Sequence, residues 1–232
     1  MKRKVRKIYK QLLDKFGRQY WWPAETPFEV MVGAILTQGA NWKNVEKAIK
    51  NLKSEGELTP LFFYNYTEER LQELIRPSGF FSIKAKRLKV LVNYMMETYK
   101  GDIEEMRSKE TGSLRRELLK LNGIGMETCD SILLYALDKP VFVVDTYTRR
   151  ILKRCGISTS DDYEFLRSLF ENSLKEKDKN KTIENYKEMH ALLVELGKRY
   201  CKTSPHCNGC PLDKWCVKKE AKLYEHRSYQ KV

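Results

Sequence analysis

The chain lacks any run of about eighteen apolar residues, so its sequence offers no candidate for a membrane-spanning helix. Its N-terminal segment, MKRKVRKIYKQLLDKF, is basic and has the spacing of an amphipathic helix, without the apolar stretch of an export signal. We therefore expect a cytoplasmic protein. Internal repeats and low-complexity tracts are also absent. Strand-forming sequence is confined to Val141–Val144, which is too short and isolated for a sheet.

Histidine is scarce, and acidic residues are outnumbered by basic ones. The three histidines, His190, His206 and His226, have no catalytic spacing, and we expect no functional role for them. Lys and Arg total 44 against 31 Asp and Glu, which gives a formal net charge of +13. A polyanionic partner, most simply nucleic acid, would suit this excess. Charge alone does not decide the point, because a basic chain can also be merely soluble.

The remaining pattern is helical almost throughout. Thr26-Pro27-Phe28-Glu29 has the form of a capping box with proline at the first helical position, followed by apolar residues on one helical face. The polar run 175–181 is expected to be a solvated loop. Together with the N-terminal segment and the helix that follows Thr26, the expected helices are 41–52, 67–76, 84–99, 114–121, 127–137, 146–155, 161–175 and 183–200.

The most informative stretch is the turn Leu121-Asn122-Gly123-Ile124-Gly125, which lies between two of these helices. Two glycines allow backbone N–H groups to face a phosphate, so the turn predicts a helix–hairpin–helix that grips DNA. Twenty residues later Asp145 ends the apolar run that starts at Pro140. A DNA-gripping hairpin followed by a single carboxylate is what hydrolysis of a base–sugar bond requires. Asp145 also precedes a helix and could serve only as its N-cap.

Four of the six cysteines lie in one short stretch, Cys201-x5-Cys207-x2-Cys210-x5-Cys216. Clustered thiols in an intracellular chain bind metal more often than they form disulfides. One loop that wraps four thiolates around a single centre suits a [4Fe–4S] cluster, whereas structural zinc usually takes paired Cys-x2-Cys knuckles. Zinc and free thiols stay open as alternatives. Cys129 and Cys155 stand alone, and we expect both to be small buried apolar residues.

From Thr26 to Cys216 the chain resembles the endonuclease III superfamily of DNA glycosylases, whose signature is helix–hairpin–helix, a Gly/Pro-rich segment and an aspartate. The resemblance implies an all-α helix-hairpin-helix DNA glycosylase fold. Residues 23–138 would form a six-helix barrel domain containing the hairpin. Residues 1–22 and 139–232 would form a second helical domain with the [4Fe–4S] loop. The first gap of that loop has five residues here, where the family usually has six.

The resemblance also implies roles for residues and a partner. Asp145 would be catalytic, the turn residues Leu121, Gly123 and Gly125 would bind DNA, and Gln38 would be wedged into the gap left by a flipped base. The partner would be double-stranded DNA that contains a damaged base. We expect a monomer, nucleoid-associated in a prokaryotic cell.

The resemblance breaks at the position of the family's catalytic lysine. Bifunctional members carry a lysine two residues after the second hairpin glycine, where it forms a Schiff base with the sugar. Here that position is Glu127, and a carboxylate cannot form an imine. Lys120 and Lys139 are not obvious substitutes. We expect a monofunctional enzyme that uses water as the nucleophile. Glu127 could instead be only a first-turn acid that complements the helix dipole.

A further set of motifs resembles the branch that removes alkylated purines, chiefly 3-methyladenine: Trp21-Trp22-Pro23, Leu36 to Trp42, Arg76 to Phe80 and Lys84 to Leu88. We expect the indoles of Trp21, Trp22 and Trp42 and a buried Glu127 to form a base pocket, because a methylated purine is cationic and stacks well on electron-rich rings. Packing in the core is the plainer role for these indoles. Arg76 and the lysines from Lys84 to Lys89 are expected on solvated faces, with DNA contact open.

These observations predict a base-excision-repair DNA glycosylase that acts on an alkylated purine. Two alternatives stay open: a glycosylase/AP lyase of the endonuclease III kind for oxidised pyrimidines or mismatches, and a non-catalytic iron–sulfur DNA-binding protein. The sequence leaves the exact lesion, residual lyase activity and the role of the cluster undecided.

Overall fold

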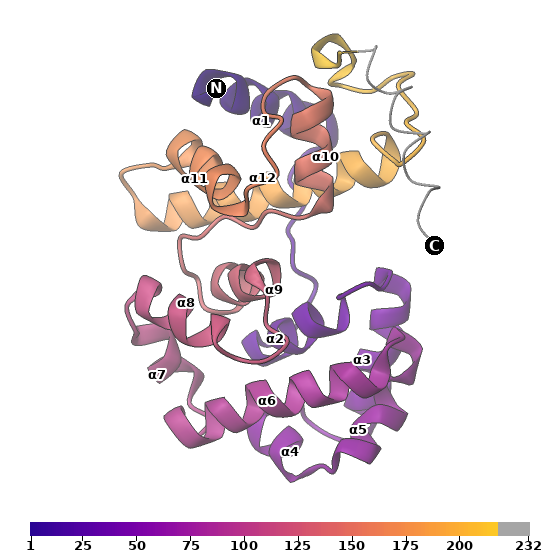
Figure 1. Ribbon diagram of the computed structural model, residues 1–232, viewed down its shortest axis with the longest axis vertical. Coiled ribbons are helices and arrows are strands. Elements are labelled where there is room, and N and C mark those ends of the chain that lie inside the picture. Colours follow the sequence, from indigo (N-terminus) through magenta and orange to yellow (C-terminus); the bar gives the residue numbers. More distant parts are fainter. Residues whose placement is uncertain (218–232) are drawn as a thin grey trace. The chain divides into compact units, whose positions relative to one another are not determined.

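The computed structural model describes residues 1–217, and within that range helices are joined by turns and extended segments, with no β-strand (Figure 1). The expected all-α fold is therefore confirmed. None of the helices in this part of the chain is long and apolar enough to cross a bilayer. The elements are α1 (Lys2–Phe16), α2 (Pro27–Leu36), α3 (Trp42–Glu55), α4 (Pro60–Asn65), α5 (Glu68–Ile75), η1 (Arg76–Ser78), α6 (Phe81–Tyr99), α7 (Ile103–Ser108), α8 (Thr111–Leu119), α9 (Met126–Ser131), η2 (Ile132–Ala136), α10 (Thr146–Arg154), α11 (Tyr163–Leu174), α12 (Lys179–Arg199) and η3 (Asp213–Trp215).

The chain folds into two compact units, each with its own core. Unit 1 combines residues 1–21 with the chain from Val141 onward, and unit 2 is Trp22–Pro140. The sequence placed the corresponding boundaries at 23 and 138. The assignment of these parts as a barrel domain and a cluster domain stays a prediction.

Helix α2 forms the centre of unit 2. It begins at Thr26, whose hydroxyl accepts a hydrogen bond of 3.1 Å from the Glu29 amide, and Pro27 takes the first helical position where a missing N–H costs nothing. The Glu29 carboxylate reaches back to the amide of Glu25, at 3.0 Å. Every residue from Phe28 to Leu36 is buried, and all of them except Glu29 are apolar or glycine, so the helix is enclosed on all sides and contacts α3, α6, α9 and η2.

Unit 1 brings the N-terminal helix beside the C-terminal helices. Helix α1 packs against α11 and α12, as Figure 1 shows, and buries Val5, Ile8 and Leu12. Helix α10 lies on α12 at Gly197, where a Cβ atom would come within 2.1 Å of the Tyr147 ring. Only glycine permits this approach, which sets the N-terminal end of α10 against α12.

Several element boundaries differ from those expected. The short helices α4 and α7 were not expected, and α6 begins at Phe81 rather than Lys84. Helix α12 begins at Lys179, inside the expected loop 175–181, because the Asp178 carboxylate caps it by accepting from the Asn180 amide at 2.8 Å. The helix expected over 127–137 is α-helical only to Ser131 and π-helical from Ile132 to Ala136.

Candidate functional site

Asp145 is a buried carboxylate at the start of α10, in unit 1. Its Oδ1 accepts a hydrogen bond of 2.7 Å from the Thr148 amide, so it is the N-cap, and its exposed fraction is only 7%. Burial acts to raise the pKa of Asp145, but His190 and the Thr148 amide outweigh it and hold that pKa below its ordinary value. The group is therefore an anion at neutral pH. The N-cap and catalytic roles are compatible, because Oδ2 takes no part in the cap.

His190, on α12, is the neighbour of Asp145 that sequence reasoning missed. Its Nε2 lies 3.7 Å from Asp145 Oδ2, and its ring packs beside Trp21 at 5.7 Å between centroids and Phe142 at 6.5 Å. The histidine is 4% exposed. Its position on the apolar face of α12, between the buried Met189 and Leu193, was the signal that could have marked it.

The tryptophans expected to form one pocket are divided between the units. Trp22 meets Trp42 edge-on at 5.7 Å between ring centroids and Tyr135 at 5.4 Å, all within unit 2. We call these three residues the aromatic group. Trp21 instead contacts His190, and Lys198 Nζ lies 5.5 Å from the centre of its ring. Tyr135, which is buried, was not among the residues that the sequence singled out.

The hairpin between α8 and α9 takes the form that the sequence predicted. Gly123 has φ of +87°, a conformation that favours glycine, and the Ile124 amide donates to the Leu121 carbonyl at 3.1 Å to close the turn. Gly125 differs: it caps α9 with an ordinary φ of −82°, and a Cβ atom there would meet no other atom within 4 Å. Nothing inside the protein therefore requires glycine at position 125. Leu121 is half-buried.

Gln38, which follows α2, is tied to the hairpin. Its Nε2 donates to the Gly123 carbonyl at 3.1 Å and to Thr128 Oγ1 at 2.8 Å, and its Oε1 accepts from the Arg87 guanidinium at 2.5 Å. The amide is fully engaged within unit 2. The structure thus joins two of the four expected DNA-binding positions, Gln38 and Gly123, to Thr128 of α9 in one network.

Glu127 lies in the first turn of α9 and is exposed, so the expectation that it is buried was wrong. Its neighbour in sequence, Thr128, is buried instead, because the helix turns that position toward Gln38. The two lysines weighed as alternative nucleophiles lie elsewhere. Lys120 is exposed at the end of α8, and the buried Lys139 donates its Nζ to the Lys109 carbonyl at 2.5 Å.

Among the lysines of α6, Lys86 is exposed as expected, but Lys84 and Lys89 differ from expectation. Lys84 is 1% exposed, rather than on a solvated face, because it donates to two backbone carbonyls. Lys89 Nζ lies within hydrogen-bonding distance of three carbonyls, those of Phe63, Tyr64 and Tyr66, at 2.8 to 3.2 Å. Arg76 is exposed as expected.

The loop with four cysteines lies at the C-terminal end of α10. Arg154 donates to Cys201 Sγ at 3.3 Å and to the Lys202 carbonyl at 2.6 Å, and Arg150 donates to the Cys201 carbonyl at 2.8 Å. Burial, together with the neighbouring thiols of Cys216, Cys201 and Cys207, raises the pKa of the Cys210 thiol to about 11. The four thiols are near enough to influence one another, which fits a soft metal centre.

That fit is incomplete. Among residues 1–217 no group of three or more His, Cys, Asp or Glu side chains is arranged as a formed metal site. Cys129 and Cys155 are both buried as expected, but Cys155 does not stand alone, because its Sγ lies 3.8 Å from Cys216 Sγ.

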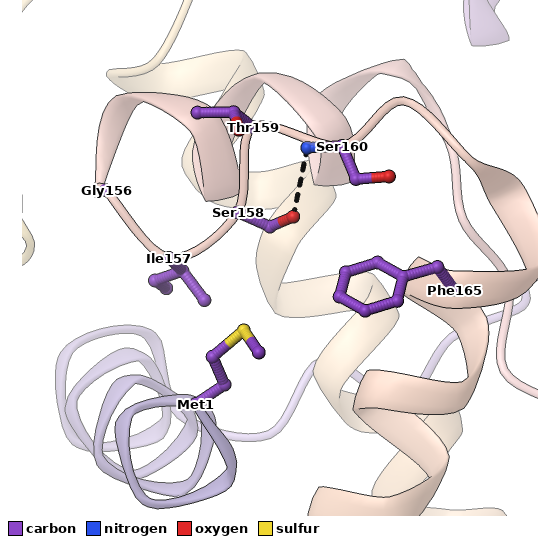
Figure 2. A pocket seen from close by; sticks show the side chains of 7 residues that line it. All are labelled: Met1, Gly156, Ile157, Ser158, Thr159, Ser160 and Phe165. Carbon is purple, nitrogen blue, oxygen red and sulfur yellow. Dashed lines mark hydrogen bonds between the residues drawn. The ribbon is translucent and has the colours of Figure 1, made fainter.

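A cavity of about 400 Å³ also occurs in unit 1, away from the residues that the sequence singled out. Figure 2 shows the residues that line it, which are Met1, Gly156, Ile157, Ser158, Thr159, Ser160 and Phe165. None of these has an acid, base or thiol side chain. The Ser160 amide donates to Ser158 Oγ at 3.1 Å, which closes the turn above it. With no titratable side chain in its lining, the cavity offers no catalytic group.

Known proteins resemble this chain in sequence and in fold. A family model described as HhH-GPD superfamily base excision DNA repair protein matches residues 32–176. A Methanocaldococcus jannaschii protein, named provisionally as a DNA repair glycosylase, is 50% identical over 218 residues, which cover 93% of this chain and 96% of the relative. Among solved structures, Helicobacter pylori 3-methyladenine DNA glycosylase bound to 1,N6-ethenoadenine gives a TM-score of 0.75 at 31% identity, and covers 84% of this chain and 97% of its own. A trapped covalent complex of endonuclease III with DNA gives a TM-score of 0.79 at 25% identity, with 96% and 99% covered.

Proposed function

Because the chain belongs to the HhH-GPD superfamily of base excision DNA repair proteins, we propose that it is a DNA glycosylase for alkylated purines such as 3-methyladenine. It hydrolyses the N-glycosidic bond of the damaged base with water and leaves an abasic site. The observation that carries the proposal is the buried, ionised Asp145 in a chain that also has the glycine hairpin. The similarity to the Helicobacter pylori enzyme supports the choice of lesion.

Asp145 is the catalytic residue in this proposal. Cleavage of a base–sugar bond passes through a sugar with oxocarbenium character, and a fixed carboxylate stabilises the positive charge as it develops. The Thr148 amide fixes Oδ1, at 2.7 Å, and Oδ2, which lies 3.7 Å from His190 Nε2, is the oxygen that we assign to the sugar or to the attacking water. Because His190 and the Thr148 amide lower the pKa of Asp145, its carboxylate is anionic at neutral pH.

The aromatic group recognises the base. An alkylated purine carries a positive charge, and cation–π attraction to an indole is worth roughly 1–2 kcal/mol when both partners are desolvated. Trp22 and Trp42 are half-buried and meet edge-on, and Tyr135 packs against Trp22 in a tilted orientation, so the two indoles are held in place before a base binds. Flipping a base costs a few kcal/mol, and only a base that stacks well recovers this cost.

The hairpin holds DNA by its backbone. Gly125 is exposed, and no atom of the protein would clash with a side chain at this position. We therefore attribute the glycine to a binding partner whose atoms approach the backbone closely. A DNA phosphate fits, because backbone N–H groups in a hairpin donate to its oxygens. The net charge of +13 supports such contacts over a wider surface.

The test of the proposal is base release from methylated duplex DNA by the purified protein, with the freed bases identified by chromatography. We expect 3-methyladenine to be released and no covalent complex to be trapped by borohydride, because position 127 has a carboxylate instead of an amine. Release of oxidised pyrimidines alone, or a trapped complex, would contradict the proposed lesion or the monofunctional mechanism respectively.

Charge at position 127 should bias the choice of lesion. Glu127→Gln removes a negative charge that attracts a cationic base but leaves the size of the side chain unchanged. Because Glu127 is exposed, we expect only a modest loss, roughly two- to fivefold, in excision of 3-methyladenine, and none for a neutral lesion. Trp22→Ala should weaken excision of both lesions. Equal loss for both lesions in Glu127→Gln would contradict a charge effect.

The residues that would hold a [4Fe–4S] cluster are Cys201, Cys207, Cys210 and Cys216. A cluster there would supply four iron–thiolate bonds that rigidify the loop. Arg150 and Arg154 on α10 already anchor its first residues. The cluster role proposed for this chain is therefore structural.

Metal analysis tests this assignment. We expect anaerobically purified protein to be yellow-brown with about four irons per chain, and Cys210→Ser to lose colour and melt at a lower temperature. Cys129→Ser is the matched control, because Cys129 lies in unit 2, and it should keep the colour. Colourless wild-type protein with one zinc per chain would contradict the cluster.

A further inference from the structure

Helix α6 carries two cations one turn apart that both face the inside of unit 2. Lys84 is 1% exposed and Arg87 is half-buried. A buried cation is costly unless hydrogen bonds compensate it, so the partners of these side chains explain their position. Residues three apart on a helix share a face, and the two cations therefore act on the same region.

Lys84 joins the ends of two helices. Its Nζ donates to the Leu36 carbonyl and to the Ser78 carbonyl, each at 2.7 Å. Leu36 ends α2 and Ser78 ends η1, where carbonyls have no partner within the helix. Burial and the Arg87 charge lower the pKa of Lys84 to about 8, yet even the neutral amine keeps two N–H groups for these two carbonyls.

Two loops leave from the residues that Lys84 ties together. Residues 37–41, here called the Gln38 loop, follow Leu36, and residues 79–80, the Phe80 turn, follow η1. The loops touch, since a Cβ atom on Gly39 would lie 3.7 Å from the Phe80 ring. Phe80 is 70% exposed and has a φ of +47°, an uncommon conformation for a bulky residue. A strained backbone thus presents an aromatic ring to the outside.

Arg87 connects the Gln38 loop to the hairpin. Its guanidinium donates to Gln38 Oε1 at 2.5 Å. Its stem lies on Gly123 so closely that a Cβ atom there would be 2.3 Å from Arg87 Cγ. Gln38 completes the link through its bonds to the Gly123 carbonyl and Thr128 Oγ1.

We propose that Lys84 and Arg87 are positioning residues that hold the Gln38 loop, the Phe80 turn and the hairpin as one preset surface for probing DNA. The inference rests on the proposed function, and it adds residues that would not touch the reacting atoms. A side chain that enters a base stack must be aimed within a fraction of an ångström, which requires support that is itself fixed. Arg87 would act through Gln38, and Lys84 through the backbone of both loops.

A double-mutant cycle between Arg87 and Gln38 tests the proposal. Arg87→Met keeps an apolar stem on Gly123 and removes only the donor to Gln38. The fluorescence of 2-aminopurine, placed opposite a stable abasic-site analogue, reports the opening of the duplex. The measurement therefore does not require cleavage of a base–sugar bond. We expect Arg87→Met to slow opening roughly tenfold in the wild-type background and less than twofold in Gln38→Ala, because coupled residues are not additive.

Lys86→Met is the matched control for lost charge, since Lys86 is an exposed cation on the same helix. Lys86→Met should weaken binding to undamaged duplex, measured by fluorescence anisotropy, as much as Arg87→Met does. It should leave the rate of duplex opening unchanged. Equal slowing by both variants, or slowing by Arg87→Met that persists in Gln38→Ala, would overturn the positioning role.

Two further variants separate positioning from folding. Lys84→Met should slow opening about as much as Arg87→Met, but it leaves two buried carbonyls unpaired and lowers the melting temperature. Thr128→Val removes one acceptor of Gln38 with little change in shape, and Thr128→Ser restores the hydroxyl. We expect slower opening for Thr128→Val alone. Equal rates for the two Thr128 variants would contradict the network.

The outcomes for the wild-type protein keep this inference distinct from the proposed function. Duplex opening without release of any damaged base would contradict the glycosylase activity and leave the positioning role standing. Base release without a change in 2-aminopurine fluorescence would contradict the positioning role and leave the activity standing.

Discussion

Asp145→Asn should bind lesion DNA nearly as well as the wild-type protein and lose roughly 100- to 1,000-fold in the rate of base release, the scale of loss for a preorganised electrostatic group. The amide oxygen of asparagine can still accept from the Thr148 N–H, so the cap of α10 is kept. What disappears is the negative charge that opposes the positive sugar. Single-turnover release of 3-methyladenine at saturating enzyme measures the effect.

Asp162→Asn is the matched control for this change. Asp162 also caps a helix, α11, by accepting from the Phe165 amide at 2.6 Å, but it is exposed and distant in sequence from the hairpin. The variant should release base at the wild-type rate. Wild-type turnover by Asp145→Asn, or equal loss in both variants, would remove Asp145 from the mechanism.

The lowered pKa of Asp145 also has a consequence for stability. A carboxylate whose folded-state pKa is depressed stabilises the native state above its ordinary pKa of 3.8, and this contribution is lost as the pH falls through the folded value. Asp145 therefore stays ionised through the neutral range. Any fall in activity between about pH 5 and 7 must therefore come from a group other than Asp145.

The second large effect is expected at the pair Arg115 and Asp130, which joins the two helices of the hairpin. The guanidinium donates twice to the carboxylate, at 2.7 and 3.1 Å, and Asp130 is 0% exposed. Arg115→Met would leave a buried charge without its main partner, which typically costs about 3–5 kcal/mol. We expect a fall of this size in the free energy of unfolding, measured by urea denaturation.

A double variant provides the control. Arg115→Met combined with Asp130→Asn removes both charges, so it should recover much of the stability lost by Arg115→Met alone. Arg116→Met, at the exposed neighbouring position, should change stability by less than about 0.5 kcal/mol. If Arg115→Met is as stable as Arg116→Met, the pair does not secure the hairpin.

Local features of the chain were predictable because they depend on residues a few positions apart. The caps at Thr26 and Asp145, the positive φ of Gly123 and the helical periods of α3, α5 and α10 follow from turn chemistry and apolar spacing. The short helices α4 and α7 were not predicted, because six residues are too few to show a helical period. The first turns of α6 and α12 were also not predicted, since apolar spacing marks the buried centre of a helix better than its ends.

The sequence by itself determined that this chain is basic and helical, that a glycine hairpin precedes a single capping carboxylate, and that four thiols share one loop. Each of these properties depends on residue type and short spacing. Only the tertiary structure decided that His190 lies beside Asp145, that Trp21 and Trp22 serve different units, and that Lys84 and Arg87 point inward. Those contacts join residues far apart along the chain, and which face of a helix meets which loop depends on how all the helices pack.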